Sequence, residues 1–161
     1  MKDPKIVDYK NLKKLIPKLT GKKVLVGGCF DILHIGHVCF LKAAKEQGDI
    51  LIIALESDEF IRKNKKREPF HTQSARAEIL SCLKIVDVVV LLPSFNSYDN
   101  YLKLVEIIKP DVVAITKDDP QIENKKRQVN KVGAILKIVT PHINNITSSS
   151  MLIKKLAKFF F

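Results

Sequence analysis

Two histidines three residues apart stand where a predicted strand leads into a predicted helix. The stretch that holds them runs from Gly27 to His37 and includes His34 and Gly36. If a helix begins at His34, both imidazole rings lie on one face of its first turn, where unpaired N–H groups and the helix dipole favour an anion. Two imidazoles beside free amides can hold phosphate oxygens and stabilise charge that develops at phosphorus during displacement. The spacing therefore favours a phosphate-handling site over a pair of core histidines.

Glycines and cysteines surround the two histidines. Gly27 and Gly28 allow a tight exit from the strand and a close approach of a ligand to the backbone. Gly36 removes a side chain that would block a phosphate. Cys29 and Cys39 flank the site, but no base partner is predicted for either, so we expect small core thiols and not nucleophiles.

The segment His34-Ile35-Gly36-His37 resembles the HxGH motif of the nucleotidyltransferase superfamily, which includes cytidylyltransferases and adenylyltransferases. Class I aminoacyl-tRNA synthetases share the motif, but they need further domains and a KMSKS loop that a chain of 161 residues does not hold. The resemblance covers about residues 22–158. It implies catalytic roles for the two histidines and nucleotide contacts at Gly28, Cys29, Phe30, Asp31 and Gly36.

A second element of the same resemblance lies near the end of the chain. Thr147, Ser148, Ser149 and Ser150 are similar to the hydroxyl-rich turn that opens the last helix of small nucleotidyltransferases and holds the distal phosphates. Serine and threonine are also ordinary N-cap residues, but three serines in series exceed what a cap requires. Met151 stands where the family often has Lys or Asn, so the motif leaves the nucleotide base open.

Basic residues between the two motifs form a third part of the predicted site. The segment 62–69 is strongly basic and contains a proline, so we expect a mobile loop. By resemblance it supplies lysines that close over the triphosphate, which assigns catalytic roles to Lys63 and Lys66; a solvated charge run is the alternative. Downstream, Arg76 matches an arginine that contacts nucleotide or acceptor, and an ordinary salt bridge is the alternative.

Acidic residues that follow predicted strands complete the candidates. Asp118 and Asp119 stand where relatives have an acidic residue that lines the base and ribose pocket. Asp58 would equally serve as the cap of a following helix. The resemblance implies Mg²⁺ bound with the triphosphate and not in a dedicated carboxylate cage, so we predict no metal ligands in the chain.

Alternating apolar runs and helical patterns predict the elements that position these residues. The apolar runs are rich in Val, Ile and Leu, as expected where helices cover both faces of a parallel sheet. We expect an α/β, Rossmann-like fold with a five-stranded parallel sheet, in one domain over residues 1–161 with a helical extension over 1–21. The expected strands are 24–28, 50–55, 88–92, 112–115 and 134–139, and the expected helices are 11–19, 36–47, 72–83, 98–109, 121–132 and 149–160.

Composition limits the classes of partner. The net charge of +11 would favour nucleic acid, but among 28 basic residues arginine is rare and lysine is dispersed, so we expect solubilising surface and a small polyanion such as ATP or CTP. No apolar run approaches the roughly 20 residues needed to cross a bilayer. We expect a cytoplasmic protein with reduced thiols. The resemblance also implies a homodimer, for which the end at Phe159-Phe160-Phe161 is one candidate contact; docking on its own body is the alternative.

The acceptor is the least specified part of the prediction. The amino-acid sequences of segments 30–38 and 152–156 are most similar to those of heptose 1-phosphate adenylyltransferases, with glycerol 3-phosphate cytidylyltransferases and FAD synthetases as alternatives. All would transfer AMP or CMP to a small phosphorylated acceptor and release pyrophosphate. A nucleotide- or RNA-binding module without catalysis is the alternative of a different class, but it has no need of two histidines and a serine-capped helix.

Overall fold

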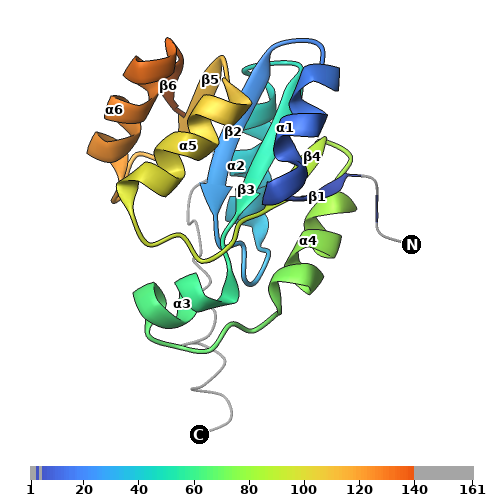
Figure 1. Ribbon diagram of the computed structural model, residues 1–161. Helices are drawn as coiled ribbons and strands as arrows, with labels where there is room; N and C mark the ends of the chain where they lie inside the picture. The colour runs from blue at the N-terminus through green and yellow to red at the C-terminus, as the bar shows by residue number, and fades with distance from the viewer. Residues whose placement is uncertain (1–2, 4, 140–161) are drawn as a thin grey trace, which may run out of the picture.

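One parallel sheet organises the computed structural model, which describes residues 3 and 5–139 (Figure 1). Six strands lie in the order β1-β4-β3-β2-β5-β6, and all neighbours are parallel. The predicted α/β architecture is confirmed, but the predicted number of five strands is wrong. The strands are β1 Ile6–Asp8, β2 Lys23–Gly28, β3 Ile50–Leu55, β4 Val88–Leu91, β5 Val112–Ile115 and β6 Ile135–Ile138.

The additional strand, β1, lies at one edge of the sheet beside β4. Ile6 pairs with Val89 and Asp8 pairs with Leu91. The N–H of Val89 also donates to the carbonyl of Lys5 at 2.9 Å. Three residues are too few to display the alternation that indicates a strand. The predicted helical extension therefore contains an edge strand.

The rest of this extension is a series of short turns and not one helix over 11–19. It consists of the 3-10 turn η1 Tyr9–Asn11, α1 Leu12–Leu15 and the 3-10 turn η2 Ile16–Lys18. Pro17 lies at the start of η2. Because proline has no N–H to donate to the preceding turn, the α-helical hydrogen bonding stops there.

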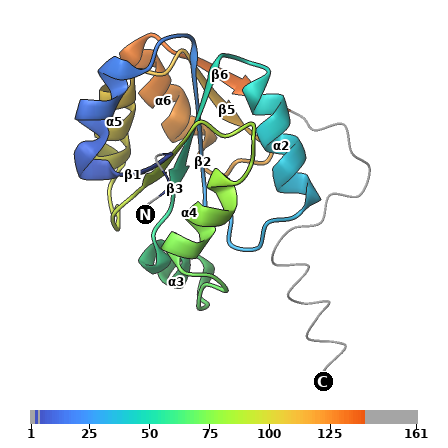
Figure 2. The ribbon, with the colours of Figure 1, turned by 90° about the vertical axis from the view of Figure 1, so that its right-hand side faces the viewer.

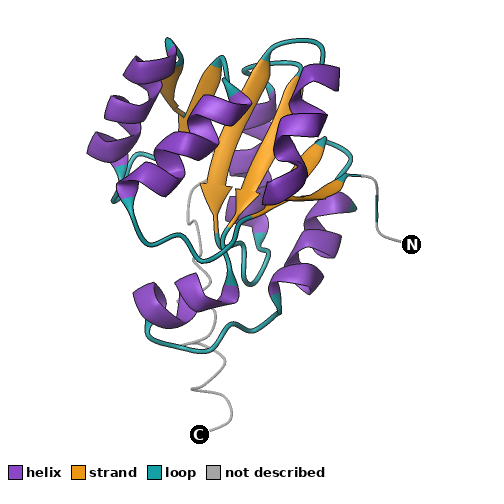
Figure 3. Cartoon of the chain, viewed as in Figure 1, coloured by secondary structure: helices purple, strands orange, loops and turns teal. Residues whose placement is uncertain are grey.

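Helices cover both faces of the sheet, as Figures 2 and 3 show. The strand β2 illustrates the alternation: Leu25 packs into the core beneath α1, α5 and α6, whereas Val24 and Val26 pack into the core beneath α2 and α4. No helix among the described residues is long and apolar enough to span a membrane. The longer helices are α2 Ile35–Lys45, α4 Gln73–Ser81, α5 Tyr98–Ile108 and α6 Ile122–Val132.

The remaining helix, α3 Asp58–Lys65, lies beyond the carboxyl ends of the strands (Figure 1). Ser57 caps it by accepting a hydrogen bond from the N–H of Phe60 at 3.2 Å, so the cap is not Asp58. The predicted loop over 62–69 is wrong in its first half, because residues 62–65 form the last turn of α3. The helix ends at Lys66, which adopts a left-handed conformation with φ 51°.

The direction in which the chain builds the sheet reverses at β2. The chain continues from β2 through β3 and β4 on one side, then returns to add β5 and β6 on the other. In open parallel sheets, ligands bind at the carboxyl ends of the strands beside such a reversal. The segment that follows β2 contains both histidines of the HxGH motif.

Candidate active site

The two histidines stack on each other at the start of α2. Their ring centroids are 3.8 Å apart and their planes are inclined by 24°. His34 is the N-cap residue of α2 and has an extended backbone, whereas His37 lies in the first helical turn. The prediction that both rings share one face of this turn is confirmed.

Each ring keeps a buried nitrogen without a partner. Nδ1 of His34 and Nδ1 of His37 have no hydrogen-bond partner among the described residues. Burial lowers the pKa of both side chains; that of His37 falls to about 4, with His34 acting in the same direction and a hydrogen bond to the backbone of Ile32 opposing it. Both rings are therefore largely uncharged at neutral pH. An unpaired ring nitrogen that carries a proton can donate a hydrogen bond to an anionic ligand at this helix N-terminus.

Two cavities meet at this pair. The large cavity has a volume of about 750 Å³ and the small cavity about 390 Å³. The residues that line both include His34, His37, Gly28, Cys29 and Phe30. The structure thus brings most of the residues predicted around the HxGH motif to one junction.

Gly28 and Phe30 support His37 from the strand side. Phe30 adopts a left-handed conformation with φ 45°, and its ring centroid lies 5.1 Å from that of His37. A Cβ on Gly28 would lie 2.9 Å from Cε2 of Phe30, closer than carbon atoms tolerate. The glycine therefore leaves room for the aromatic ring that packs against the catalytic candidate.

Asp31 ties the HxGH motif to residues 66–72, which connect α3 to α4 and which we call the strap. The side chain is buried and lines the large cavity. Its carboxylate accepts the N–H groups of Phe70 and His71 at 2.9 and 3.1 Å and pairs with Arg67. Burial opposes its ionisation, but these donors outweigh burial and hold the pKa of Asp31 below its usual value. In this geometry Asp31 acts as an anchor for the strap.

Arg76 is fully buried behind the motif and lines neither cavity. Its guanidinium pairs with Asp58 at 2.7 Å and donates to the carbonyls of His71 and Cys29. It therefore connects α4 with α3 and with the exit of β2. The structure places Arg76 in the salt bridge that the sequence left as the alternative to a nucleotide contact.

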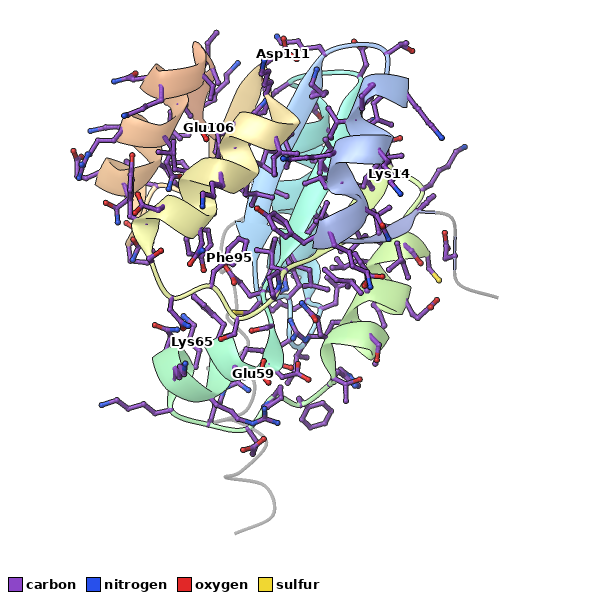
Figure 4. All side chains as sticks on the ribbon, viewed as in Figure 1. Lys14, Glu59, Lys65, Phe95, Glu106 and Asp111 are labelled. Carbon is purple, nitrogen blue, oxygen red and sulfur yellow. The ribbon has the colours of Figure 1, made fainter. Side chains whose placement is uncertain are left out.

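The two predicted lysines lie in different surroundings. Lys63 lines the large cavity, and its Nζ donates to Oδ1 of Asn96 at 3.3 Å. Lys66 is exposed and lines neither cavity. Lys65, which lies in the same predicted basic segment, also lines the large cavity; Figure 4 labels it on α3, together with Phe95 on the loop before α5.

The predicted aspartates after β5 reach the small cavity. Asp118 lines it, and Asp119 lines both cavities. Asp119 also pairs with Lys125 of α6 at 2.7 Å. The predicted phosphate-binding residues 147–150 lie outside the described residues.

The large cavity contains a buried acid that the sequence analysis missed. Glu56 directly follows β3 and is 7% exposed. Both of its carboxylate oxygens accept the hydroxyl of Tyr101, at 3.1 and 3.2 Å. Burial raises the pKa of Glu56 to about 7, against the opposing influence of Tyr101, Lys125 and Arg76. Glu56 directly follows the predicted strand 50–55. Because ligands bind at the carboxyl ends of parallel strands, this position could have identified Glu56 as a candidate site residue.

Cys29 lines both cavities as an unactivated thiol. Burial raises its pKa to about 11, and the nearby charge of Glu56 adds to the effect. A thiol in this state is protonated at neutral pH and is a poor nucleophile. The raised pKa agrees with the expectation that Cys29 is not a nucleophile, but the side chain is half-buried at the cavity wall and not in the core.

The sequence matches a known family over most of its length. The family model described as "Cytidylyltransferase-like" matches residues 25–155. A protein named FAD synthase from Pyrococcus horikoshii is 38% identical over 143 residues, which cover 86% of this chain and 94% of that protein. The FAD synthase of Thermococcus sibiricus is 34% identical, over 88% of this chain and 99% of that protein.

A longer relative matches in part, and two solved structures share the fold. The bifunctional protein HldE of Geobacter metallireducens is 36% identical over 86% of this chain but only 28% of its own length. A lipopolysaccharide core biosynthesis protein from Thermoplasma volcanium superimposes with a TM-score of 0.64 at 29% identity, over 77% of this chain and 100% of that chain. Pantoate-beta-alanine ligase from Francisella tularensis gives a TM-score of 0.66 at 19% identity, over 94% and 76%, which is a likeness of fold.

Proposed function

Because the chain belongs to the cytidylyltransferase-like family of nucleotidyltransferases, we propose that it is an adenylyltransferase that joins the AMP moiety of ATP to FMN, forming FAD and pyrophosphate. Relatives named FAD synthase match it over nearly their whole length. The sequence analysis placed heptose 1-phosphate first among acceptors and FMN among the alternatives. The volume and the aromatic lining of the large cavity favour FMN.

The single observation that carries this choice is the large apolar cavity beside the histidine pair. Its volume of about 750 Å³ lies within the range of about 300–1,000 Å³ typical of small-molecule sites. Aromatic side chains of α3, of the segment between β4 and α5, and of α5 line it: Phe60, Phe95, Tyr98 and Tyr101. Such walls suit a planar aromatic ring system better than a sugar covered in hydroxyl groups.

The small cavity suits the nucleotide. Its described lining includes Gly27, Gly28, Gly36 and Ala114, which expose backbone at close range, and the predicted base and ribose contacts Asp118 and Asp119. Backbone N–H groups at the start of α2 favour phosphate oxygens. ATP in this cavity would place its α-phosphate at the junction with the large cavity, beside His34 and His37.

The proposed reaction is a direct in-line displacement. A phosphate oxygen of FMN attacks the α-phosphorus of ATP, the bond to the β-phosphate oxygen breaks, and pyrophosphate leaves without a covalent enzyme intermediate. The imidazole N–H groups of His34 and His37 donate to the phosphate oxygens on which charge increases. Lys63 and Lys65 of α3 line the large cavity, from which they would neutralise negative charge on the phosphate groups at the junction.

Mg²⁺ would enter this reaction with the triphosphate. The described residues include no group of three or more His, Cys, Asp or Glu side chains suited to a metal ion. Mg²⁺ commonly keeps several waters and binds mainly through substrate phosphates, so the proposal needs no protein cage. The homodimer implied by the resemblance and the cytoplasmic location expected from the composition stay predictions.

The test is product formation by the purified full chain. ATP or CTP is supplied with FMN, heptose 1-phosphate or glycerol 3-phosphate, with MgCl₂ present, and pyrophosphate release is measured beside chromatography of the products. We expect FAD from ATP and FMN at a rate well above every other pair. Preferential use of heptose 1-phosphate would replace the FMN proposal, and no turnover with any pair would favour a binding module.

A further inference from the structure

We propose that Glu56 is a specificity-determining residue that accepts a hydrogen bond from an N–H group on the head of the acceptor. This inference rests on the proposed function and identifies that group, for FMN, as the imide N–H of the isoalloxazine ring. Glu56 lines the large cavity. It directly follows β3 and belongs to none of the motifs described above.

The carboxylate of Glu56 has more capacity to accept than the protein uses. Its side-chain hydrogen-bond donor among the described residues is the hydroxyl of Tyr101, which its two oxygens share at 3.1 and 3.2 Å. An ionised carboxylate offers about four acceptor positions. Since a buried carboxylate gains from each donor it receives, Glu56 is prepared to accept a further N–H from a ligand.

The cations nearest to Glu56 are already paired with other acids. Lys125 forms its ion pair with Asp119 at 2.7 Å, and Arg76 forms its ion pair with Asp58 at 2.7 Å. Neither makes a salt bridge with Glu56, so the carboxylate is buried without a contacting cation among the described residues. The consequence is seen in its pKa, which burial raises to about 7. A structural carboxylate would be expected to have a closer cation.

The surroundings of Glu56 match one kind of head group. Phe95 packs edge-on against Tyr101 at 5.1 Å between centroids, which leaves an aromatic wall next to the carboxylate. The hydroxyl of Tyr98, in the same cavity, is buried and has no partner among the described residues. A flat ring whose edge presents an N–H between two carbonyls can donate to Glu56 and accept from Tyr98.

A pair of flavins that differ only at this N–H tests the inference. Binding of FMN and of N3-methyl-FMN to the full chain is followed by flavin fluorescence in the wild type, E56A, E56Q and the control E59A. Glu59 lies on α3 with an exposed side chain outside both cavities and is a matched control. We expect the wild type and E59A to prefer FMN by about 10- to 100-fold, because a buried charged acceptor strongly favours a ligand that donates to it.

The Glu56 variants separate recognition from support of Tyr101. E56A should bind the two flavins about equally, and E56Q should retain an intermediate preference because its amide oxygen still accepts. Y101F should weaken both flavins alike, since it retains the carboxylate. E56Q keeps the shape of the side chain, so it decides the question if E56A does not fold.

Two results would overturn the inference while leaving the proposed function in place. One is a wild type that forms FAD yet binds both flavins equally; the other is an E56A or E56Q variant that keeps the full wild-type preference. A wild type that binds neither flavin and forms no FAD would instead contradict the proposed function, and the inference would fall with it.

Discussion

The large and small cavities share the histidine pair but are built from different parts of the chain. The described lining of the small cavity comes from two short stretches, 27–40 and 114–119, together with Val139. The large cavity draws on β3, α3, the segment between β4 and α5, α5 itself and α6, as well as on the HxGH motif. The lining of the small cavity includes three glycines, whereas the large cavity adds long side chains from several separate elements.

This difference separates chemistry from selectivity. Backbone groups at a helix N-terminus recognise phosphate, which every nucleotide carries, so the small cavity can serve any nucleotidyltransfer reaction. Side chains from loops and separate helices can be exchanged without moving the sheet, so the large cavity is where an acceptor is chosen. Changes at the junction should therefore reduce turnover, whereas changes in the large cavity should alter acceptor binding or the stability of its walls.

The largest effect is expected at the junction itself. Replacing His34 or His37 by alanine should lower kcat about 10²- to 10³-fold, as removal of one donor to a developing oxyanion does. KM for FMN should change little, because the rings stabilise charge that appears in the transition state. Steady-state pyrophosphate release measures both constants. Full turnover in both variants would show that the stacked rings are structural.

The wall of the large cavity should be vulnerable where Asp31 holds the strap. D31N weakens the ion pair with Arg67 and the hydrogen bonds from the strap N–H groups, and we expect a loss of about 3 kcal/mol in the free energy of unfolding. The exposed Asp99 in the first turn of α5 gives the control D99N, for which we expect less than about 1 kcal/mol.

The pH dependence of this loss gives it a second signature. Because folding lowers the pKa of Asp31 below its ordinary value of 3.8, its stabilisation is present above that pH and is lost as the pH falls through the folded-state pKa. Urea unfolding at pH 7 and at pH 2.5 should therefore show a smaller gap between D31N and wild type at the lower pH. An equal gap at both pH values would contradict an ionised anchor.

Much of the fold could be predicted because its strands are local apolar runs. The strands β3 and β5 have the predicted bounds, and α6 ends at residue 132 as predicted, where Gly133 follows with a left-handed conformation of φ 70°. The edge strand β1 has only three residues, and its stability comes from pairing with β4, a contact far away in sequence. The helix α3 could not be predicted from an apolar pattern, because most of its surface is charged and faces solvent. Among its residues only Ile61 is buried.

The candidate site divides in the same way. The residues that meet around His34 and His37 follow one another along the chain, so a motif describes them. Glu56, Tyr101 and Gln128 line the large cavity from three separate elements, and no local spacing connects them. Their proximity follows from the order of the strands and the packing of α5 and α6. The acceptor site therefore could not be assembled before the topology was known.

Glu56, the buried acid of the large cavity, should lower the free energy of unfolding at alkaline pH. The folded-state pKa of Glu56 is raised from 4.5 to about 7, so the folded protein holds a proton that the unfolded chain releases between these values, and stability falls as the pH rises through them. E56Q should therefore stabilise the protein by about 2 to 3 kcal/mol at pH 8, and by almost nothing near pH 4.5. Urea unfolding measures this, with E59Q as the control that should show no such dependence.

The smallest expected effect lies on the nucleotide side of the junction. Burial keeps the pKa of His37 at about 4 in the free protein, and a triphosphate beside its ring should raise it by attraction. Between the free and bound pKa values the complex holds a proton that the free protein lacks, so ATP affinity should rise as the pH falls, by at most about tenfold per pH unit for each proton taken up. Calorimetry of ATP binding at pH 7 in two buffers of different ionisation enthalpy measures this uptake. The proton uptake measured with the double variant H34Q/H37Q gives the contribution of ATP itself, which is subtracted from the uptake of the wild type. An uptake equal in the variant and the wild type would mean that the histidines stay uncharged and act as neutral donors.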